Sequence, residues 1–263
     1  MNYKGKVVWI TGASSGIGAA LAKKYSFLGA KLILSSREKA SLNKIKHQCS
    51  MPENVVILPF DLNDFNSASI IVKSAIKFFG FIDILINNGG ISQRSLIIDS
   101  KFEIYQKLIN IDYLGHVAIS KAILPYFIDQ GGGSYVVISS VMGKYGSPFR
   151  SGYAAAKHAL HGFFDVLRME HYKDKIFVTI ICPGFVNTPI SKNALTGDGT
   201  PLGENEELNL KGLCPEYLAK KIIHSINKKK WEVSFGRREK LGVYLKKISN
   251  KLLHKIVVRS KVR

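Results

Sequence analysis

A tyrosine and a lysine stand four residues apart in SGYAAAKHAL, which covers residues 151–160. The pattern predicts a helix, on which residues at i and i+4 lie one turn apart on the same face. A cation beside a phenol favours the phenolate, so Tyr153 is a candidate general acid or base and Lys157 its partner. The pair is common in proteins, and the ordinary alternative is an amphipathic helix with a half-buried tyrosine and a solvated lysine. Other motifs must decide between these two interpretations.

The three cysteines are far apart and do not cluster with the seven histidines. The sequence therefore predicts neither a metal site nor a disulfide framework, and sparse unpaired cysteine suits a reducing compartment. The first apolar run is short, and no stretch approaches the ~18 apolar residues that a membrane-spanning helix requires. We expect a cytoplasmic protein, free or peripheral to a membrane, without a signal peptide or transmembrane helix.

Short apolar runs rich in β-branched residues alternate with helical patterns along the 263 residues. The predicted strands cover residues 7–10, 31–35, 55–59, 84–87, 135–139, 178–182 and 231–235. The helical stretches between them include residues 16–28, 67–79, 102–127, 153–171 and 215–227. This alternation predicts an α/β fold: a single-domain, Rossmann-like, doubly wound parallel sheet of about seven strands with helices on both faces.

Two segments depart from this alternation. The polar, glycine-containing segment 188–213 is long for a loop and predicts a substrate lid or a disordered insertion. After the last strand, apolar residues recur at helical spacing among lysines: Leu241, Tyr244, Leu245, Ile248, Leu252 and Ile256. We therefore expect one Rossmann-like domain over residues 1–236, lid included, and a cationic amphipathic C-terminal extension over residues 237–263.

More than half of the net charge of +19 lies in the last 36 residues, which include the extension. Residues 228–263 hold thirteen Lys or Arg against two Glu, which is +11 of the total. Three interpretations stay open: the extension lies on an anionic membrane, packs on another subunit, or caps its own domain. Nucleic acid is not an expected partner, because the chain has no interleaved aromatic platform or recognition motif.

The sequence TGASSGIG, residues 11–18, joins the first predicted strand to a helix. Such a turn lets the backbone approach a diphosphate, and the helix N-terminus offers free N–H groups and a positive dipole end. A glycine pattern alone is weak evidence, but this one has the required strand–turn–helix context. The expected cofactor-binding residues here are Gly12, Ser14, Ser15, Gly16, Ile17 and Gly18.

The second predicted strand ends in SSRE, where dinucleotide-binding folds that use NAD carry an acidic residue for the ribose 2′-hydroxyl. Ser36 occupies that position and Arg37 follows it. A guanidinium binds a 2′-phosphate through paired hydrogen bonds, whereas a carboxylate repels it. NADP(H) is therefore expected in preference to NAD(H), although Glu38 lies nearby.

Seven motifs in sequence order make the chain resemble the short-chain dehydrogenase/reductase (SDR) family over residues 6–235. They are TGASSGIG (11–18), FDL (60–62), NNGG (87–90), NIDYLG (110–115), ISS (138–140), YAAAK (153–157) and PGFVNT (183–188). NNGG has Gly89 where the family more often has Ala. With ISQRSL after it, SKAILP (120–125) and KHALHGFFDVLRME, the chain is similar to the dehydrogenase/reductase family member 7 subgroup, whose relatives act on lipophilic carbonyls such as steroids and retinoids.

The resemblance implies catalytic roles for four residues. Tyr153 would give a proton to a carbonyl oxygen or take one from an alcohol, and Ser140 would bind the same oxygen. Lys157 would hold the nicotinamide ribose. Asn110 resembles the helix-interrupting residue that anchors a water for proton relay to Lys157; the alternative for it is a hydrogen bond within the helix.

The resemblance also implies that other motif residues position the cofactor. They are Asp61 and Leu62 at the adenine, Asn88, Gly89 and Gly90 at the adenosine ribose, and Pro183, Gly184, Val186 and Thr188 at the nicotinamide. By position, the pocket walls are Ser92, Gln93, Met142, Tyr145, Phe185 and segment 188–213. Their apolar character suits a small lipophilic carbonyl or alcohol, although Tyr145, Phe149 and Phe185 can equally be core.

The expected function is NADP(H)-dependent carbonyl reduction or alcohol oxidation, in a homodimer or homotetramer formed through residues 102–127 and 153–171, as the resemblance implies. One alternative is a 3-oxoacyl-carrier-protein reductase, because a basic surface could dock an acidic carrier. Against it, the chain continues 28 residues past Phe235. Another alternative is a non-catalytic, NADPH-binding, membrane-associated scaffold, which would not need all four catalytic residues.

Overall fold

The computed structural model describes residues 2–260; the start of the predicted domain at Met1 and the end of the predicted extension at 261–263 lie outside the described residues. Seven parallel strands form one sheet in the order β3-β2-β1-β4-β5-β6-β7. The strands are β1 (Val7–Thr11), β2 (Lys31–Ser35), β3 (Val55–Ile57), β4 (Ile84–Asn87), β5 (Gly133–Ile138), β6 (Ile176–Pro183) and β7 (Glu232–Phe235). The predicted doubly wound α/β fold is confirmed, and each predicted strand end lies within two residues of the observed one.

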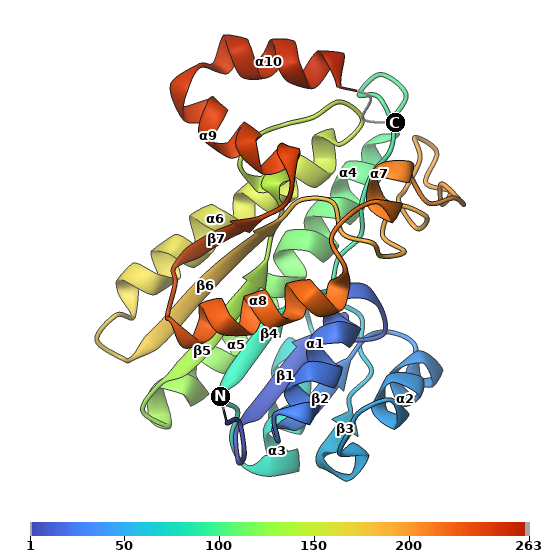
Figure 1. The fold of residues 1–263 in the computed structure, drawn as a ribbon. Coiled ribbons are helices and arrows are strands. Elements are labelled where there is room, and N and C mark those ends of the chain that lie inside the picture. Colours follow the sequence, from blue (N-terminus) through green and yellow to red (C-terminus); the bar gives the residue numbers. More distant parts are fainter. Residues whose placement is uncertain (1, 261–263) are drawn as a thin grey trace.

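Helices cover both faces of the sheet (Figure 1). One face carries α1 (Gly16–Phe27), α2 (Lys39–His47) and α8 (Pro215–Asn227). The other carries α3 (Ala68–Phe79), α5 (Gly115–Asp129) and α6 (Ser151–Glu170). Side chains alternate between the two cores along β1, because successive strand residues point to opposite faces: Val8 and Ile10 pack under α1, and Val7 and Trp9 pack under α3 and α5. Burial on both faces explains the continuous apolar runs in the sequence.

The single helix predicted over residues 102–127 is interrupted. It consists of α4 (Phe102–Ile109), a π-helical turn η2 (Asn110–Leu114) and α5. A π turn has i→i+5 hydrogen bonds and takes up about one more residue than an α-helical turn, which rotates the side chains relative to those of a continuous α-helix. This rotation matters at the candidate site.

Segment 188–213 is folded across the carboxyl end of the sheet and contains the short helix α7 (Glu207–Leu210). Isolated β-bridges join Leu195 to Gln93 and to Pro201, and join Leu213 to Val186. The segment therefore has defined contacts with the body of the domain at both ends.

The extension after β7 forms a short 3-10 helix η4 (Arg238–Lys240), α9 (Leu241–Ile248) and α10 (Asn250–Arg259) above α6 and β7 in Figure 1. Ser249 separates the two helices, and its side chain accepts a hydrogen bond from Leu252 N at 3.2 Å. The remaining short 3-10 turns are η1 (Pro52–Asn54) and η3 (Val141–Gly143). Among the described residues, no helix combines the length and apolar character needed to cross a membrane.

Candidate active site

A cleft of about 730 Å³ opens at the carboxyl ends of β1, β2, β4, β5 and β6, where the strand order reverses. The cleft collects most of the predicted site residues: Gly12, Ser14, Ser15, Gly16, Ile17, Ser36, Arg37, Asp61, Leu62, Asn88, Gly89, Gly90, Ser140, Tyr153, Lys157, Pro183, Gly184, Val186 and Thr188. Gly18 and Asn110 do not line it. A second hollow of about 620 Å³ lies at the opposite end of the strands and contains none of these residues.

The glycine loop and the loop after β4 are in close contact. Gly12 has a φ of +63°, and a Cβ at this position would lie 2.6 Å from Gly89 Cα. Asn88 Nδ2 donates to the carbonyl oxygens of Thr11 and Gly12, each at 3.0 Å. The Thr11 hydroxyl accepts from Asn88 N and Gly89 N at 3.0 and 3.1 Å. The NNGG motif therefore braces the turn that a diphosphate would approach, and Thr11 is a supporting residue that the sequence analysis missed.

The N-terminus of α1 is open toward the cleft. Ser15 precedes the helix without a side-chain capping bond, and the first turn carries no acidic residue. The first N–H groups of a helix lack partners within the helix and carry the positive end of its dipole. This arrangement, with Gly16 and Ile17 on the cleft wall, fits an anionic diphosphate.

Two buried side-chain atoms of cleft residues have no hydrogen-bond partner among the described residues: Ser36 Oγ and Asn209 Oδ1. Buried polar atoms are nearly always paired, so such atoms at a cleft wall indicate a ligand's position. Ser36 follows β2 beside the exposed Arg37, and Asn209 lies on α7, where its Nδ2 donates to Val186 O at 3.2 Å. The polar groups present therefore fit a dinucleotide that extends from β2 to α7.

Tyr153 and Lys157 lie in the first two turns of α6. Both are buried, with 8% and 4% of their surface exposed, so the solvated-lysine interpretation does not hold. Lys157 Nζ lies 5.6 Å from the centre of the Tyr153 ring and donates to Ile138 O at 3.3 Å. The cation thus lies beside the phenol at the floor of the cleft.

Ser140 lies two residues after the end of β5 and is the N-cap residue of η3. Its Oγ accepts from Met142 N at 3.1 Å and donates to Pro183 O at 3.3 Å. These two bonds fix the hydroxyl on the cleft wall between β5 and β6, on the same side of the sheet as Tyr153.

Asp112, rather than Asn110, lies beside Lys157. Asp112 is fully buried, its Oδ1 accepts from Ile91 N at 2.7 Å, and its Oδ2 lies 3.6 Å from Lys157 Nζ. Asn110 is half-buried and does not line the cleft, so the structure does not bring it to the lysine. Residues two apart on a helix point to roughly opposite sides, and within η2 Asp112 is the one that points inward.

Burial raises the pKa of Asp112, while Lys157 and the Ile91 N–H oppose that rise. His116, one turn further along, is also fully buried, with Nε2 2.7 Å from Gly89 O. Burial, with a smaller contribution from Lys157, lowers the pKa of His116 to about 3. His116 is therefore neutral at physiological pH, and the Lys157–Asp112 ion pair lies beside it.

Segment 188–213 is held to the body by a buried ion cluster that the sequence analysis missed. Glu206 accepts from Arg94 Nε and NH2 at 2.6 and 2.5 Å, and from Arg150 NH2 at 3.2 Å. The three side chains are at most 7% exposed. Burial, followed by the charge of Arg94, lowers the pKa of Arg150 to about 10, while Glu206 opposes that shift. No local pattern could reveal this cluster, because its members come from three separate segments.

The predicted pocket walls are only partly placed as expected. Segment 188–213 does line the cleft, through residues that include Ile190 and Leu195, but the five individually predicted wall residues do not. Met142 still packs near Tyr153. Gln93 is fully buried, with Oε1 accepting from Gly152 N at 2.8 Å. Tyr145 points toward the extension, where its hydroxyl donates to Glu239 O at 2.7 Å.

The comparisons with known proteins agree with this geometry. The family model described as short chain dehydrogenase matches residues 6–198. The chain is 42% identical over 231 residues to "Dehydrogenase/reductase SDR family protein 7-like" of Anopheles gambiae, covering 86% of this chain and 73% of the relative. It is 44% identical over 206 residues to human "Dehydrogenase/reductase SDR family member 7", covering 76% of this chain but 61% of that relative.

A solved short-chain dehydrogenase/reductase from Burkholderia phymatum, in complex with NAD, superimposes with a TM-score of 0.81. The alignment covers 100% of this chain and 98% of that one at 20% identity, so it supports the fold alone.

Proposed function

This chain belongs to the short-chain dehydrogenase/reductase family of NAD(P)-dependent oxidoreductases, and on that premise we propose that it transfers a hydride between NADP(H) and a lipophilic carbonyl or alcohol. The observation that carries the proposal is one continuous cleft. At one end are the open α1 N-terminus and the Ser36–Arg37 pair, and at the other is the buried Tyr153–Lys157 pair.

The residues of the cleft suit proton transfer at a substrate oxygen. The Tyr153 hydroxyl donates a proton to a carbonyl oxygen, or its phenolate accepts one from an alcohol. The Lys157 ammonium stabilises the phenolate, and the Ser140 hydroxyl, by turning its proton away from Pro183 O, donates a hydrogen bond to the same substrate oxygen. The nicotinamide, when bound, supplies or accepts the hydride. The backbone around Gly12, Gly90 and Gly184 would hold the nucleotide.

The preference for NADP(H) rests on the end of β2. The Ser36 hydroxyl is buried without a hydrogen-bond partner among the described residues, and the exposed Arg37 stands next to it at the cleft wall. A hydroxyl donor and a guanidinium together suit a 2′-phosphate. No carboxylate stands at the Ser36 position to repel that phosphate.

The preference for a lipophilic substrate rests on the surroundings of Tyr153. Its ring packs in an apolar cluster that includes Ile91, Leu108, Met142 and Leu195. The charged side chains among the described cleft residues are Arg37, Asp61, Lys107 and Lys157. None of these belongs to the Tyr153 cluster, and only Lys157 is recorded beside the Tyr153 ring, so this end of the cleft offers few partners to a charged substrate.

The test is a calorimetric titration of the protein with NADPH and with NADH. Wild type should bind NADPH more tightly, and Arg37→Ala should weaken NADPH binding about 10- to 100-fold, the value of one or two charge-assisted hydrogen bonds, with NADH affinity unchanged. Lys39→Ala, which removes a neighbouring exposed cation on α2, is the matched control and should leave the ratio unchanged. Equal affinities in wild type would contradict the NADP(H) preference, and no binding of either nucleotide would contradict the enzyme assignment for this chain.

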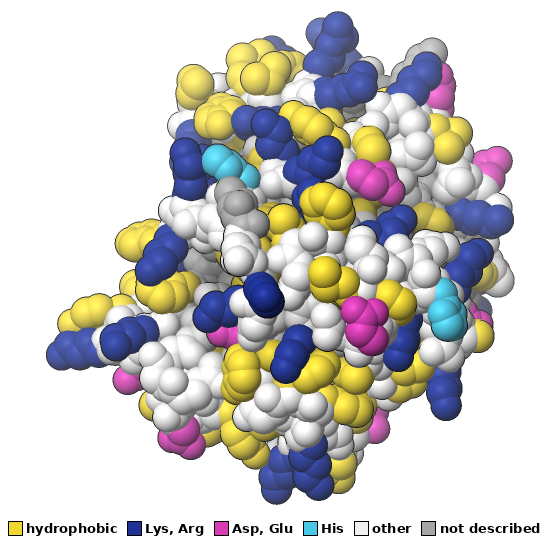
Figure 2. All heavy atoms as spheres, turned by 60° about the horizontal axis from the view of Figure 1, so that its bottom comes forward, with side chains coloured by type: hydrophobic (Ala, Val, Ile, Leu, Met, Phe, Trp, Pro, Cys, Tyr) yellow, Lys and Arg dark blue, Asp and Glu magenta, His cyan; other side chains and the backbone are white. Residues whose placement is uncertain are grey.

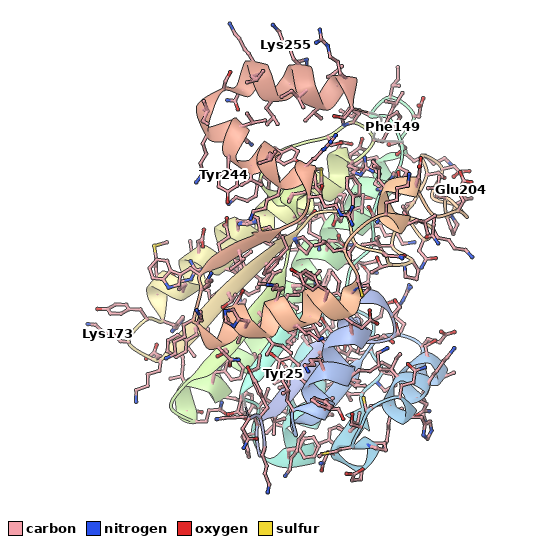
Figure 3. The ribbon with its side chains drawn as sticks, viewed as in Figure 1. Tyr25, Phe149, Lys173, Glu204, Tyr244 and Lys255 are labelled. Carbon is pink, nitrogen blue, oxygen red and sulfur yellow. The ribbon has the colours of Figure 1, made fainter. Side chains whose placement is uncertain are left out.

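The extension supports a separate proposal about where the enzyme works: peripheral binding to anionic membranes. Apolar side chains of α9 and α10 are exposed on the surface rather than buried: Leu241, Tyr244, Ile248, Leu252 and Ile256. Lysines alternate with them; Figure 3 shows Lys255 directed away from the domain. On the face that Figure 2 presents, Lys and Arg side chains likewise lie between exposed apolar groups. Apolar groups flanked by cations suit the surface of an anionic bilayer.

A further inference from the structure

We propose that Asp112 is a positioning residue whose buried carboxylate balances the charge of Lys157 and thereby sets the pH range in which Tyr153 exchanges its proton. The inference rests on the proposed function of the cleft. It concerns a residue of the NIDYLG motif (110–115) to which the sequence analysis gave no role, and it differs from the expected role of Asn110, because an amide carries no charge.

The geometry places the carboxylate where its charge must act on the lysine. Asp112 Oδ2 lies 3.6 Å from Lys157 Nζ, which is an ion-pair distance longer than a hydrogen bond. The two side chains are 0% and 5% exposed, so water screens the pair little. Asp112 Oδ2 has no hydrogen-bond partner among the described residues, so the charge on this oxygen faces the lysine without another donor.

The second oxygen of Asp112 has a separate, structural task. Its Oδ1 accepts from Ile91 N at 2.7 Å, directly after the NNGG loop. A Cβ on Gly90 would lie 3.1 Å from Asp112 Oδ1 and 3.4 Å from Lys157 Nζ, so the loop, the carboxylate and the ammonium are in contact. A substitution that keeps an acceptor at Oδ1 can therefore separate the charge of Asp112 from its role in holding the loop.

No other charged group described near Lys157 takes the place of Asp112 in balancing the charge of the lysine. From α5, His116 faces the pair and is neutral, because burial lowers its pKa to about 3. From α6, Arg150 acts on Tyr153, but this guanidinium is paired with Glu206. From β5, the Ile138 carbonyl accepts from Lys157 and carries no charge. Asp112 is thus the anion paired with Lys157 among the described residues.

The sign of the effect follows from the charges. With Tyr153 protonated, the phenol, ammonium and carboxylate together carry no net charge; without the carboxylate they carry +1. A nearby negative charge opposes the loss of a proton from a tyrosine–lysine pair, whichever of the two groups releases it. Removal of the Asp112 charge therefore moves proton release to lower pH, by about one pH unit for a charge at this distance.

The first test is the pH profile of alcohol oxidation by wild type, Asp112→Asn and Asp112→Ala. The rate should rise with pH in each protein, with the midpoint in Asp112→Asn about one pH unit lower than in wild type. Asp129→Asn, an exposed carboxylate at the end of α5, is the control and should not move the midpoint. Asp112→Ala also loses the acceptor for Ile91 N. A rate loss in Asp112→Ala but not in Asp112→Asn would therefore measure the contribution of this hydrogen bond.

The second test needs no substrate or nucleotide. Ultraviolet titration of phenolate formation in wild type, with Tyr153→Phe subtracted, gives the Tyr153 titration directly, and Asp112→Asn should shift it to lower pH. An unchanged titration and an unchanged pH profile in Asp112→Asn would overturn the inference. If wild type shows no turnover with any substrate, the proposed function fails, while the titration still decides the role of Asp112.

Discussion

The catalytic cleft and the C-terminal extension differ in how their side chains are used. Next to the cleft, several charged groups are buried and paired, as in Lys157 with Asp112 and Glu206 with two arginines. In the extension, a small apolar cluster of Val243 and Leu253 packs on the domain, while the longer apolar stripe of the same helices is exposed. The ion pairs near the cleft hold their side chains at fixed positions, whereas the extension exposes apolar side chains to the surroundings.

The two regions meet at Glu239. Its Oε1 accepts from Phe185 N at 3.1 Å, within the segment expected at the nicotinamide, and its carbonyl accepts from the Tyr145 hydroxyl. A Cβ on Gly184 would lie 2.1 Å from Glu239 Oε1, so the extension touches the cofactor segment directly. The extension and the cofactor segment are therefore in direct contact, and four variants test how far the two regions are separate.

The largest effect on activity is expected from Tyr153→Phe. The ring still fills its apolar cluster, but the transferable proton is lost, so kcat/KM with a panel of lipophilic ketones and NADPH should fall about 1,000-fold. The affinity for NADPH should stay near that of wild type. Tyr172→Phe, an exposed tyrosine, serves as the control. Retained turnover in Tyr153→Phe would place the proton donor elsewhere in the cleft.

Glu206→Ala should produce the largest loss of stability. It leaves Arg94 and Arg150 buried without their shared carboxylate, and removing one partner of a buried ion pair costs about 3–5 kcal/mol. Urea unfolding measures the change. Glu207→Ala removes an adjacent, exposed carboxylate paired with Lys211 and should cost less than about 1 kcal/mol. Equal costs for the two variants would mean that the buried cluster does not hold segment 188–213.

In the extension, replacing apolar residues should change binding rather than folding. Ile248 and Ile256 are 79% and 45% exposed, so Ile248→Ser with Ile256→Ser removes little from the core. If the extension lies on a membrane, co-sedimentation with anionic vesicles should fall at least about tenfold, because each side chain contributes about 1.5 kcal/mol or more on burial. Ile70→Ser on α3 is the exposed control. If the wild-type protein does not co-sediment with anionic vesicles, the proposal of membrane binding is contradicted.

The smallest effect is expected at the junction of the two regions. Tyr145→Phe removes the hydrogen bond to Glu239 O and should cost about 1 kcal/mol. Hydrogen exchange should become faster in α9 and α10, while NADPH affinity changes little. An NADPH affinity that falls with the loss of this bond would show that the extension and the cofactor segment act as one unit.

Sequence alone was sufficient for features that depend on neighbouring residues. Continuous apolar runs such as Val7–Thr11 identify strands buried on both faces, and the strand–turn–helix context identifies the glycine loop. The spacing of Tyr153 and Lys157 places them one turn apart on α6 in any packing, because helix geometry is local. These features are sufficient for the fold class and most residues of the cleft.

Tertiary structure alone decided which side chains meet. Within the π turn, Asp112 rather than Asn110 faces Lys157, and the motif spacing does not show which of the two residues does so. Glu206 meets Arg94 and Arg150 across 112 and 56 residues, beyond the reach of any local signal. Helical spacing in the extension predicts an apolar stripe, but whether that stripe is covered depends on the space left by Tyr145 and Val141, which Val243 and Leu253 fill instead. Pairing of distant groups and the orientation of a helix on its neighbours are properties of packing, and sequence spacing does not contain them.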